Sequence, residues 1–210
     1  MIAAVWAVAL ALPLAAPPKL LVNAQLQTAS ASGGLERAFQ PLVAAQVQPG
    51  WIGYTVPLVR GYNLGCEYVS PGGRTAPGVV HLEPPDHAVI LFRVEAGAVT
   101  RIRVLSPDCE IDAGGAPVHW LEDVRPADST ALLENFADMA SSTQMKDRRE
   151  PLRENAIYAI SVTADPAGVE FLIATARKDQ NQNIRRACIS ALARSKDPRA
   201  VTFLEDLLKH

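Results

Sequence analysis

The chain has 210 residues, with 20 lysines and arginines against 22 aspartates and glutamates, so its formal net charge is −2. This balance argues against a basic nucleic-acid-binding protein and against an acidic solvating tail. The length is sufficient for two modest domains.

The first 24 residues have the pattern of an export signal. Residues 2–16 are apolar, and a run of about 15 residues is short for a membrane span but suits a signal-peptide core. Val22 and Ala24 supply small residues at −3 and −1 of a cleavage site before Gln25. We therefore expect an exported protein, periplasmic or extracellular in a bacterial envelope, without a membrane span after cleavage. No lysine or arginine precedes the apolar core, so an uncleaved anchor or a buried helix stays open.

Residues 25–50 are rich in Gln, Ala, Ser and Gly, a composition typical of loosely ordered segments. We expect a flexible lead-in to the first domain, with at most one short helix over residues 35–44.

From Trp51 onward the pattern changes to short β-branched runs bounded by Pro and Gly, which predicts strands. The runs are WIGYTVPL, GVVHLE, HAVILFRVE, AVTRIRVL and APVHWLE. Ala96-Gly97 predicts a hairpin turn, because glycine readily adopts positive φ. Alternation places two sets of side chains on one face of this hairpin, namely Ile90, Phe92 and Val94 opposite Thr100, Ile102 and Val104. We expect a small antiparallel β module over residues 51–121.

The three cysteines have different expected roles. Cys66 and Cys109 both lie in the β module, and an oxidising compartment would favour a disulfide between them. Two separate thiols remain the alternative. Cys188 lies at a helix-core position, where a cysteine acts as a small apolar residue.

Two polar stretches are candidates for metal binding, and we interpret both as surface turns. HLEPPDH offers histidines and carboxylates, but its Pro-Pro pair marks a turn, where polar residues serve solvation. DCEIDAGG is acidic but lacks the EF-hand spacing. The sequence contains no GxSxG, HExxH, Walker A or GxGxxG motif. We expect no metal, no cofactor and no enzymatic activity.

The last third of the chain is an internal repeat. Residues 146–178 align without a gap to residues 178–210, with ten identities in 33 pairs at an offset of 32. A fixed period of this size is typical of stacked units that bury their apolar faces on their neighbours.

The pattern of apolar residues predicts two helices in each unit. Apolar residues follow the i, i+4, i+7, i+8 spacing of an amphipathic helix in both copies, namely Leu152, Ala156, Ala159 and Ile160, then Ile184, Cys188, Ala191 and Leu192. Asp165-Pro166 and Asp197-Pro198 predict N-terminal caps of the following helices, with proline at the first helical position. We expect an α-solenoid over residues 122–210, beginning with a divergent helix at 128–140.

The repeated pattern resembles the HEAT repeat, in the short bacterial form also called the phycobilisome-lyase HEAT-like repeat. The resemblance rests on Asp, a hydrophobic-Arg pair and Ile-x-Ala, followed by Asp-Pro-x2-Val-x-Phe-Leu. It implies a ladder of structural, non-catalytic contacts between stacked units, formed by Asp147, Arg153, Asp179 and Arg185. The resulting fold class is α+β, with a small antiparallel β module followed by a short α-solenoid of HEAT-like helix pairs.

In the register of these repeats, a unit is helix A, a loop and helix B. The chain then has helix B at 152–163, a complete unit at 166–195 and a last helix A at 198–209. The next ladder aspartate would fall just beyond His210. We expect either that the array continues or that this edge associates, including with another copy.

These features favour an exported, non-enzymatic protein-binding or scaffold protein whose solenoid contacts a protein partner. Residues that lie away from the apolar stripes of the B helices are candidate contacts, namely Glu154, Tyr158, Arg186 and Arg194. One alternative comes from the resemblance alone, since some proteins with these repeats are chromophore lyases or assembly factors. Another is an accessory subunit of a larger envelope assembly.

Overall fold

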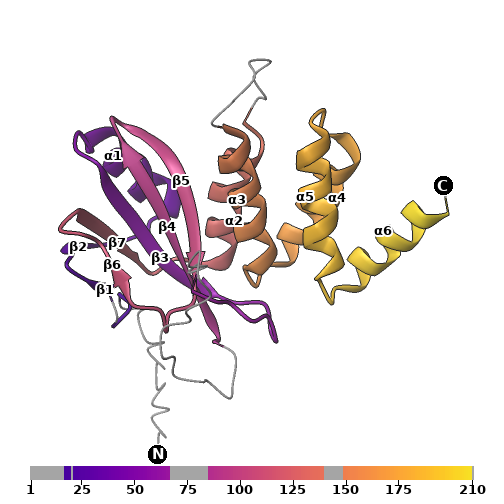
Figure 1. Ribbon diagram of the computed structural model, residues 1–210, viewed down its shortest axis with the longest axis horizontal. Coiled ribbons are helices and arrows are strands. Elements are labelled where there is room, and N and C mark those ends of the chain that lie inside the picture. Colours follow the sequence, from indigo (N-terminus) through magenta and orange to yellow (C-terminus); the bar gives the residue numbers. More distant parts are fainter. Residues whose placement is uncertain (1–16, 20, 67–84, 140–148, 210) are drawn as a thin grey trace, which may run out of the picture.

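The computed structural model describes residues 17–19, 21–66, 85–139 and 149–209, which form a β-sheet followed by a row of helices (Figure 1). The fold is α+β, with a helical solenoid at its C-terminal end. The expected strand GVVHLE, residues 78–83, lies outside the described residues.

Among the residues that the structure describes, the main sheet has five strands in the order β2-β7-β3-β4-β5. Their bounds are Gln25–Ser30 for β2, Gly50–Pro57 for β3, His87–Glu95 for β4, Ala98–Leu105 for β5 and Pro117–Glu122 for β7. The expected antiparallel pairing holds for β3–β4 and β4–β5, whereas β7 runs parallel to both β2 and β3. A helical crossover joins β2 to β3 and leaves these two strands running in the same direction, and β7 lies between them in that direction.

The β4–β5 hairpin turns at the expected residues. Ala96 and Gly97 both have positive φ, 50° and 73°, as a tight two-residue turn requires. Ile90 pairs with Val104 and Phe92 with Ile102. A register shift at Arg93/Val94 then places Val94 opposite Val99. Thr100 therefore does not take its expected place in this set.

Residues 25–50 do not form the flexible lead-in that their composition suggests. Strand β2 pairs with β7 along its whole length. Helix α1 (Leu35–Ala45) packs against the sheet through residues spaced four apart, namely Leu35, Phe39 and Val43, which are all buried. The strand that pairs with β2 lies about 90 residues later in the chain. The composition of residues 25–50 alone therefore does not show that this segment is folded.

Within the described residues, five helices follow the sheet. All but the last stand side by side, and the last extends away from the others (Figure 1). They are α2 (Pro126–Ala137), α3 (Arg149–Val162), α4 (Pro166–Lys178), α5 (Gln182–Ala193) and α6 (Pro198–Leu208). Helix α2 pairs with α3 and α4 pairs with α5, while α6 lies at the end of the row. These positions confirm the expected succession of A and B helices.

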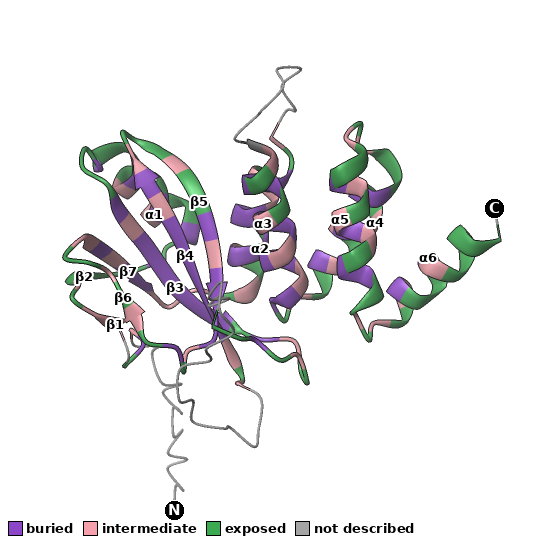
Figure 2. Cartoon of the chain, in the orientation of Figure 1, coloured by how far each residue is buried: buried purple, intermediate pink, exposed green. Residues whose placement is uncertain are grey.

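The sheet and the first helices share one hydrophobic core (Figure 2). The Phe92 ring of β4 lies 4.9 Å from Phe39 of α1 and 5.6 Å from Phe136 of α2. Tyr54 of β3 and Ser129 of α2 are joined by a buried hydrogen bond of 2.9 Å between their hydroxyls. The β module and the solenoid are therefore parts of one packed unit.

The chain after β3 ties the sheet to the turn between α3 and α4. The Val59 amide donates to the Val162 carbonyl at 2.9 Å, and the Ala164 amide donates to the Pro57 carbonyl at 2.9 Å. These backbone hydrogen bonds hold the end of α3 against the end of β3 and the residues that follow it.

A second, smaller cluster packs on the other face of the sheet, from Val89, Leu91, Leu105 and Trp120. Nearby, strand β1 (Leu21–Val22) pairs in parallel with β6 (Ile111–Asp112). Residues 21–24 fall within the expected leader, so cleavage before Gln25 would remove β1.

Candidate functional site

Arg153 connects the two helical units from a buried position. Its side chain, in α3, is nearly inaccessible, with the residue 3% exposed. Nε donates to the Ala137 carbonyl at the end of α2 at 2.6 Å, and a terminal nitrogen donates to the Asp179 carboxylate beyond α4. The other Asp179 oxygen accepts the Asn181 amide at 2.8 Å. Arg153 and Asp179 thus make the contact between units that the resemblance to HEAT repeats implies, while Asp147 lies outside the described residues.

Arg185 is equivalent to Arg153 in the next unit and makes half of the same set of contacts. It donates to the Asp179 and Gln180 carbonyls at 2.7 and 3.2 Å, as Arg153 donates to the end of α2. Within the described residues no carboxylate pairs with Arg185, which is half-exposed.

The Asp-Pro caps form as predicted. Asp165 accepts the Ala167 amide at 3.2 Å, and Asp197 accepts the Arg199 amide at 2.8 Å. Arg199 also binds the Asp197 carboxylate through Nε and a terminal nitrogen, at 3.0 and 2.8 Å. These hydrogen bonds hold the Asp197 pKa below its usual range.

Three of the four candidate contact residues are exposed on the B helices or directly at their end, where Arg194 caps α5. Glu154 of α3 and Arg186 of α5 occupy equivalent positions of consecutive units, and Arg194 lies about two turns beyond Arg186. None of the three forms an ion pair with another described residue. Partial burial and the nearby Glu150 raise the pKa of Glu154. We call Glu154, Arg186 and Arg194 the B-helix surface.

The fourth candidate, Tyr158, makes an internal contact instead. It is half-buried, and its ring lies 6.4 Å from that of Tyr62 in the loop after β3. The helical spacing correctly separates Tyr158 from the stripe facing α2, but no local pattern shows that a distant loop folds back onto this side of α3. Tyr158 therefore does not belong to the B-helix surface.

The two B helices are joined along this surface. Asn183 at the start of α5 donates to the Glu150 carboxylate at the start of α3, at 2.7 Å. This bond and the buried Arg153–Asp179 contact keep the exposed faces of α3 and α5 in register, so Glu154 and Arg186 keep a fixed relation.

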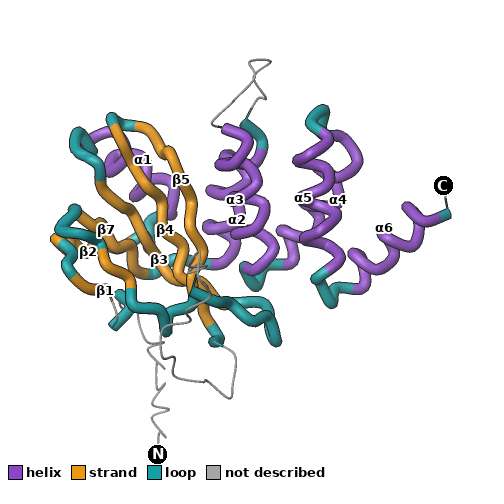
Figure 3. Tube along the Cα trace, in the orientation of Figure 1, coloured by secondary structure: helices purple, strands orange, loops and turns teal. Residues whose placement is uncertain are grey.

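A groove of about 350 Å³ is lined by the loop after β3 and by the α3–α4 and α5–α6 turns. Figure 3 draws the loops and turns of the chain in teal. Ile160, Val169 and Leu172 contribute apolar lining, and Arg60 and Lys196 add positive charge. Sequence analysis missed this groove, because it forms only when segments far apart in the chain pack together.

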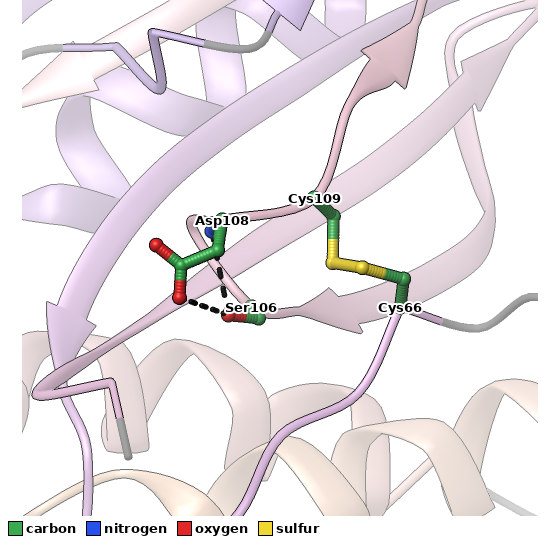
Figure 4. Close-up of a disulfide and its surroundings, with 4 residues drawn as sticks. All are labelled: Cys66, Ser106, Asp108 and Cys109. Atoms are coloured by element: carbon green, nitrogen blue, oxygen red, sulfur yellow. Dashed lines mark hydrogen bonds between the residues drawn. A yellow bond between two sulfur atoms is a disulfide. The ribbon is translucent and has the colours of Figure 1, made fainter. Parts of the chain in front are cut away.

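Cys66 and Cys109 form a disulfide next to the strand ends of the sheet (Figure 4). Ser106 and Asp108 form a short hydrogen-bonded turn just before Cys109, with 3.1 Å between the Ser106 hydroxyl and the Asp108 carboxylate. Cys188 is a free thiol buried in α5, and burial raises its pKa to about 12. A thiol with such a pKa is a packing residue and a poor nucleophile.

The described residues of the two stretches considered for metal binding form hydrogen bonds with nearby groups. Asp86 pairs with His87 at 2.7 Å, and Asp112 accepts from Gly114 and Asn23 at 2.8 and 3.1 Å. Across the described part of the chain, no group of three or more His, Cys, Asp or Glu could hold a metal. His81 and Glu83 lie outside it. Within the same residues, no helix is long and apolar enough to cross a membrane.

Comparison with known proteins agrees with the helical repeat. A family model described as HEAT repeats matches residues 142–210. No curated protein and no solved structure matches the chain. The C-terminal helices thus have HEAT-repeat character, and repeats of this kind suggest a role in contacts with other proteins.

Proposed function

We propose that this chain is an exported, non-enzymatic protein-binding or scaffold protein that holds a protein partner on its B-helix surface. Solenoids bind partners along extended surfaces, because equivalent helices present their exposed faces in register. The observation that carries the proposal is the fixed alignment of Glu154 with Arg186 and Arg194, three exposed charges without ion pairs among the described residues.

The charges on this surface define the partner that would fit. Helix α3 presents Glu154, and Glu150 lies one turn before it, whereas α5 presents Arg186 and Arg194. A partner with basic groups opposite α3 and acidic groups opposite α5 would complement both helices. Charges of this kind chiefly govern the choice of partner and the rate of association.

Export is supported by two independent features. The apolar run at residues 2–16 has the length of a signal-peptide core. The Cys66–Cys109 disulfide is of the kind that persists in oxidising compartments and is rare in the cytosol. Both features are consistent with a periplasmic or extracellular location.

The test compares capture of proteins from envelope extracts by two variants of the full chain. Arg186→Glu with Arg194→Glu reverses charge on the B-helix surface, and we expect it to lose a partner that the natural chain retains. Arg101→Glu with Lys178→Glu makes the same change in net charge at exposed positions elsewhere and should retain that partner. Equal capture by all three proteins would rule out this surface.

A further inference from the structure

The groove beside the loop after β3 is lined by two unpaired cations. Arg60 comes from that loop and Lys196 from the turn between α5 and α6, and both residues are exposed. Neither forms an ion pair or a side-chain hydrogen bond with any residue in the described part of the chain. Two like charges from segments far apart in the sequence thus line one groove without a described counter-ion.

Contacts within the fold place Lys196 beside the segment that carries Arg60. The Val59 amide donates to the Val162 carbonyl at 2.9 Å, so Arg60 directly follows a bond that holds the loop against the end of α3. The Lys196 ammonium lies beside Gly61, only 3.2 Å from where a β-carbon on that glycine would lie. Gly61 also has a φ of 75°, a conformation that glycine adopts readily. The lysine therefore reaches from its turn to the residue next to Arg60.

The two aspartates in the groove lining do not balance these cations. Asp165 and Asp197 are both helix caps, which accept the Ala167 and Arg199 amides. Arg199 also pairs with the Asp197 carboxylate at 2.8 Å. Among the described residues, Asp165 alone then stands against the two cations, so the groove carries net positive charge and favours an anion.

Apolar side chains line the groove together with these charges. They come from α3, α4 and α5, namely Ile160, Val169, Leu172 and Ala191. The hydroxyls of Ser161 and Thr163 donate to carbonyls within α3 at 2.7 and 2.9 Å. The volume of about 350 Å³ is near the lower end of the range of small ligand sites, about 300 to 1,000 Å³. The ligand that fits is a small anion with an aliphatic group close to its charge.

We propose that the groove binds the C-terminal residue of a protein partner, with Arg60 and Lys196 holding its carboxylate and the apolar lining holding an aliphatic side chain. A chain terminus carries both groups on one carbon atom, whereas phosphate offers charge without an aliphatic group. The choice of a protein terminus rests on the proposed protein-binding function. It adds a second contact to that function, outside the three residues of the B-helix surface.

The probe is a pentapeptide, Gly-Ser-Gly-Ala-Leu, with a fluorescent label at its N-terminus and a free C-terminal carboxylate. Fluorescence anisotropy with the full chain should give saturable binding. The same peptide with a C-terminal amide should bind about tenfold more weakly, as expected for loss of a charge-assisted contact. A peptide that ends in serine instead of leucine should bind about fivefold more weakly, because it leaves the apolar lining uncovered.

Protein variants locate the contact. Arg60→Gln with Lys196→Gln should weaken binding of the carboxylate peptide about tenfold and should remove the difference between acid and amide. Ala164→Phe, at an exposed position of the lining, fills the groove and should prevent binding of both peptides. Arg101→Gln with Lys178→Gln makes the same change in charge at exposed positions elsewhere and should leave binding unchanged. Circular dichroism verifies that each variant is folded.

Absence of saturable binding, or equal affinity for the acid and the amide, would overturn the groove as a carboxylate site. If hexanoate competed as strongly as the unlabelled peptide, the groove would take free aliphatic acids, and the assignment to a protein terminus would be wrong.

Capture from envelope extracts separates this site from the proposed function. If capture depended on Arg186 and Arg194 while the peptide did not bind, the groove assignment alone would fail. If the peptide bound as expected while charge reversal at those two arginines left capture unchanged, the B-helix surface alone would fail.

Discussion

Arg153 shows how one residue joins the units of the solenoid. Arg153 is only 3% exposed, so its guanidinium must satisfy its donors within the protein. It donates to the Ala137 carbonyl and to the Asp179 carboxylate. The cost of removing one partner of such a pair exceeds its net contribution, because the other charge stays buried and unpaired.

We therefore expect Arg153→Met to lower the free energy of unfolding by about 3 kcal/mol. Arg186→Met, at an exposed position of the neighbouring B helix, should change it by less than about 0.5 kcal/mol. Urea unfolding followed by circular dichroism measures both. A loss below about 1 kcal/mol for Arg153→Met would contradict a buried contact between units.

The cysteines allow a direct chemical test. A thiol reagent at pH 8 should label no cysteine of the native chain, because Cys188 is buried and the other two are bonded. Denaturation without reductant should expose one thiol. Three thiols under those conditions would show that Cys66 and Cys109 are not paired, and rapid native labelling would contradict the burial of Cys188.

The same thiol makes stability depend on alkaline pH. Burial raises the Cys188 pKa to about 12, whereas the pKa of an unfolded thiol is about 8.5. As pH rises, the thiol of the unfolded chain loses its proton before the thiol of the folded chain. The stability of the folded chain that comes from keeping Cys188 neutral is therefore fully present below pH about 8.5 and is lost as pH rises toward about 12. Urea midpoints should fall between pH 8 and 10, and Cys188→Ala should flatten this fall.

The repeat made the roles of some residues predictable and left others hidden. Asp179 repeats Asp147 and Arg153 is repeated by Arg185, and the resemblance to HEAT repeats implies the contact that Arg153 makes with Asp179. Tyr158 stands at an equally regular position, but the loop around Tyr62 covers it. That contact depends on where the chain leaves β3 in three dimensions. The spacing of apolar residues along the sequence carries no information about this position.

At the scale of elements, the segment before β3 contributes to the core. Helix α1 places Phe39 against Phe92 with ring centroids 4.9 Å apart. Strand β2, in contrast, has all six residues exposed and is held by pairing with β7. The spacing of Leu35, Phe39 and Val43 marks the helix in the sequence, but an exposed polar strand has no hydrophobic alternation that would reveal it.

Phe39→Ala should therefore lower the free energy of unfolding by about 3 to 4 kcal/mol, since it leaves a cavity between α1 and the sheet. Gln40→Ala on the exposed side of the same helix is the matched control and should be nearly neutral. Chemical denaturation of the full chain gives both values. Equal stability of the two variants would contradict the packing of α1 against the sheet and would favour a flexible lead-in over residues 25–50.

At the scale of the whole molecule, the sheet and the solenoid form one packed unit. Phe92 contacts both α1 and α2, and the Tyr54–Ser129 hydrogen bond crosses between β3 and α2. The boundary expected near residue 121 follows a change of periodicity in the sequence. Periodicity reports secondary structure, and it does not show whether two neighbouring regions share a core.

A shared core predicts a single cooperative unfolding transition. Trp51 and Trp120 lie in β3 and β7 and report on the sheet, while circular dichroism at the helix band reports on the solenoid. In a Trp6→Phe background, fluorescence and circular dichroism should give the same urea midpoint. Two separated midpoints would show that the β module and the helices fold independently.

The measurement that most directly tests the account is site-specific photocrosslinking in envelope extracts. A photoreactive amino acid at position 186, on the B-helix surface, should yield a discrete adduct with a partner protein. The same amino acid at position 101, on β5, should yield none. Adducts from position 101 alone, or from neither position, would contradict the claim that the exposed faces of α3 and α5 hold a protein partner.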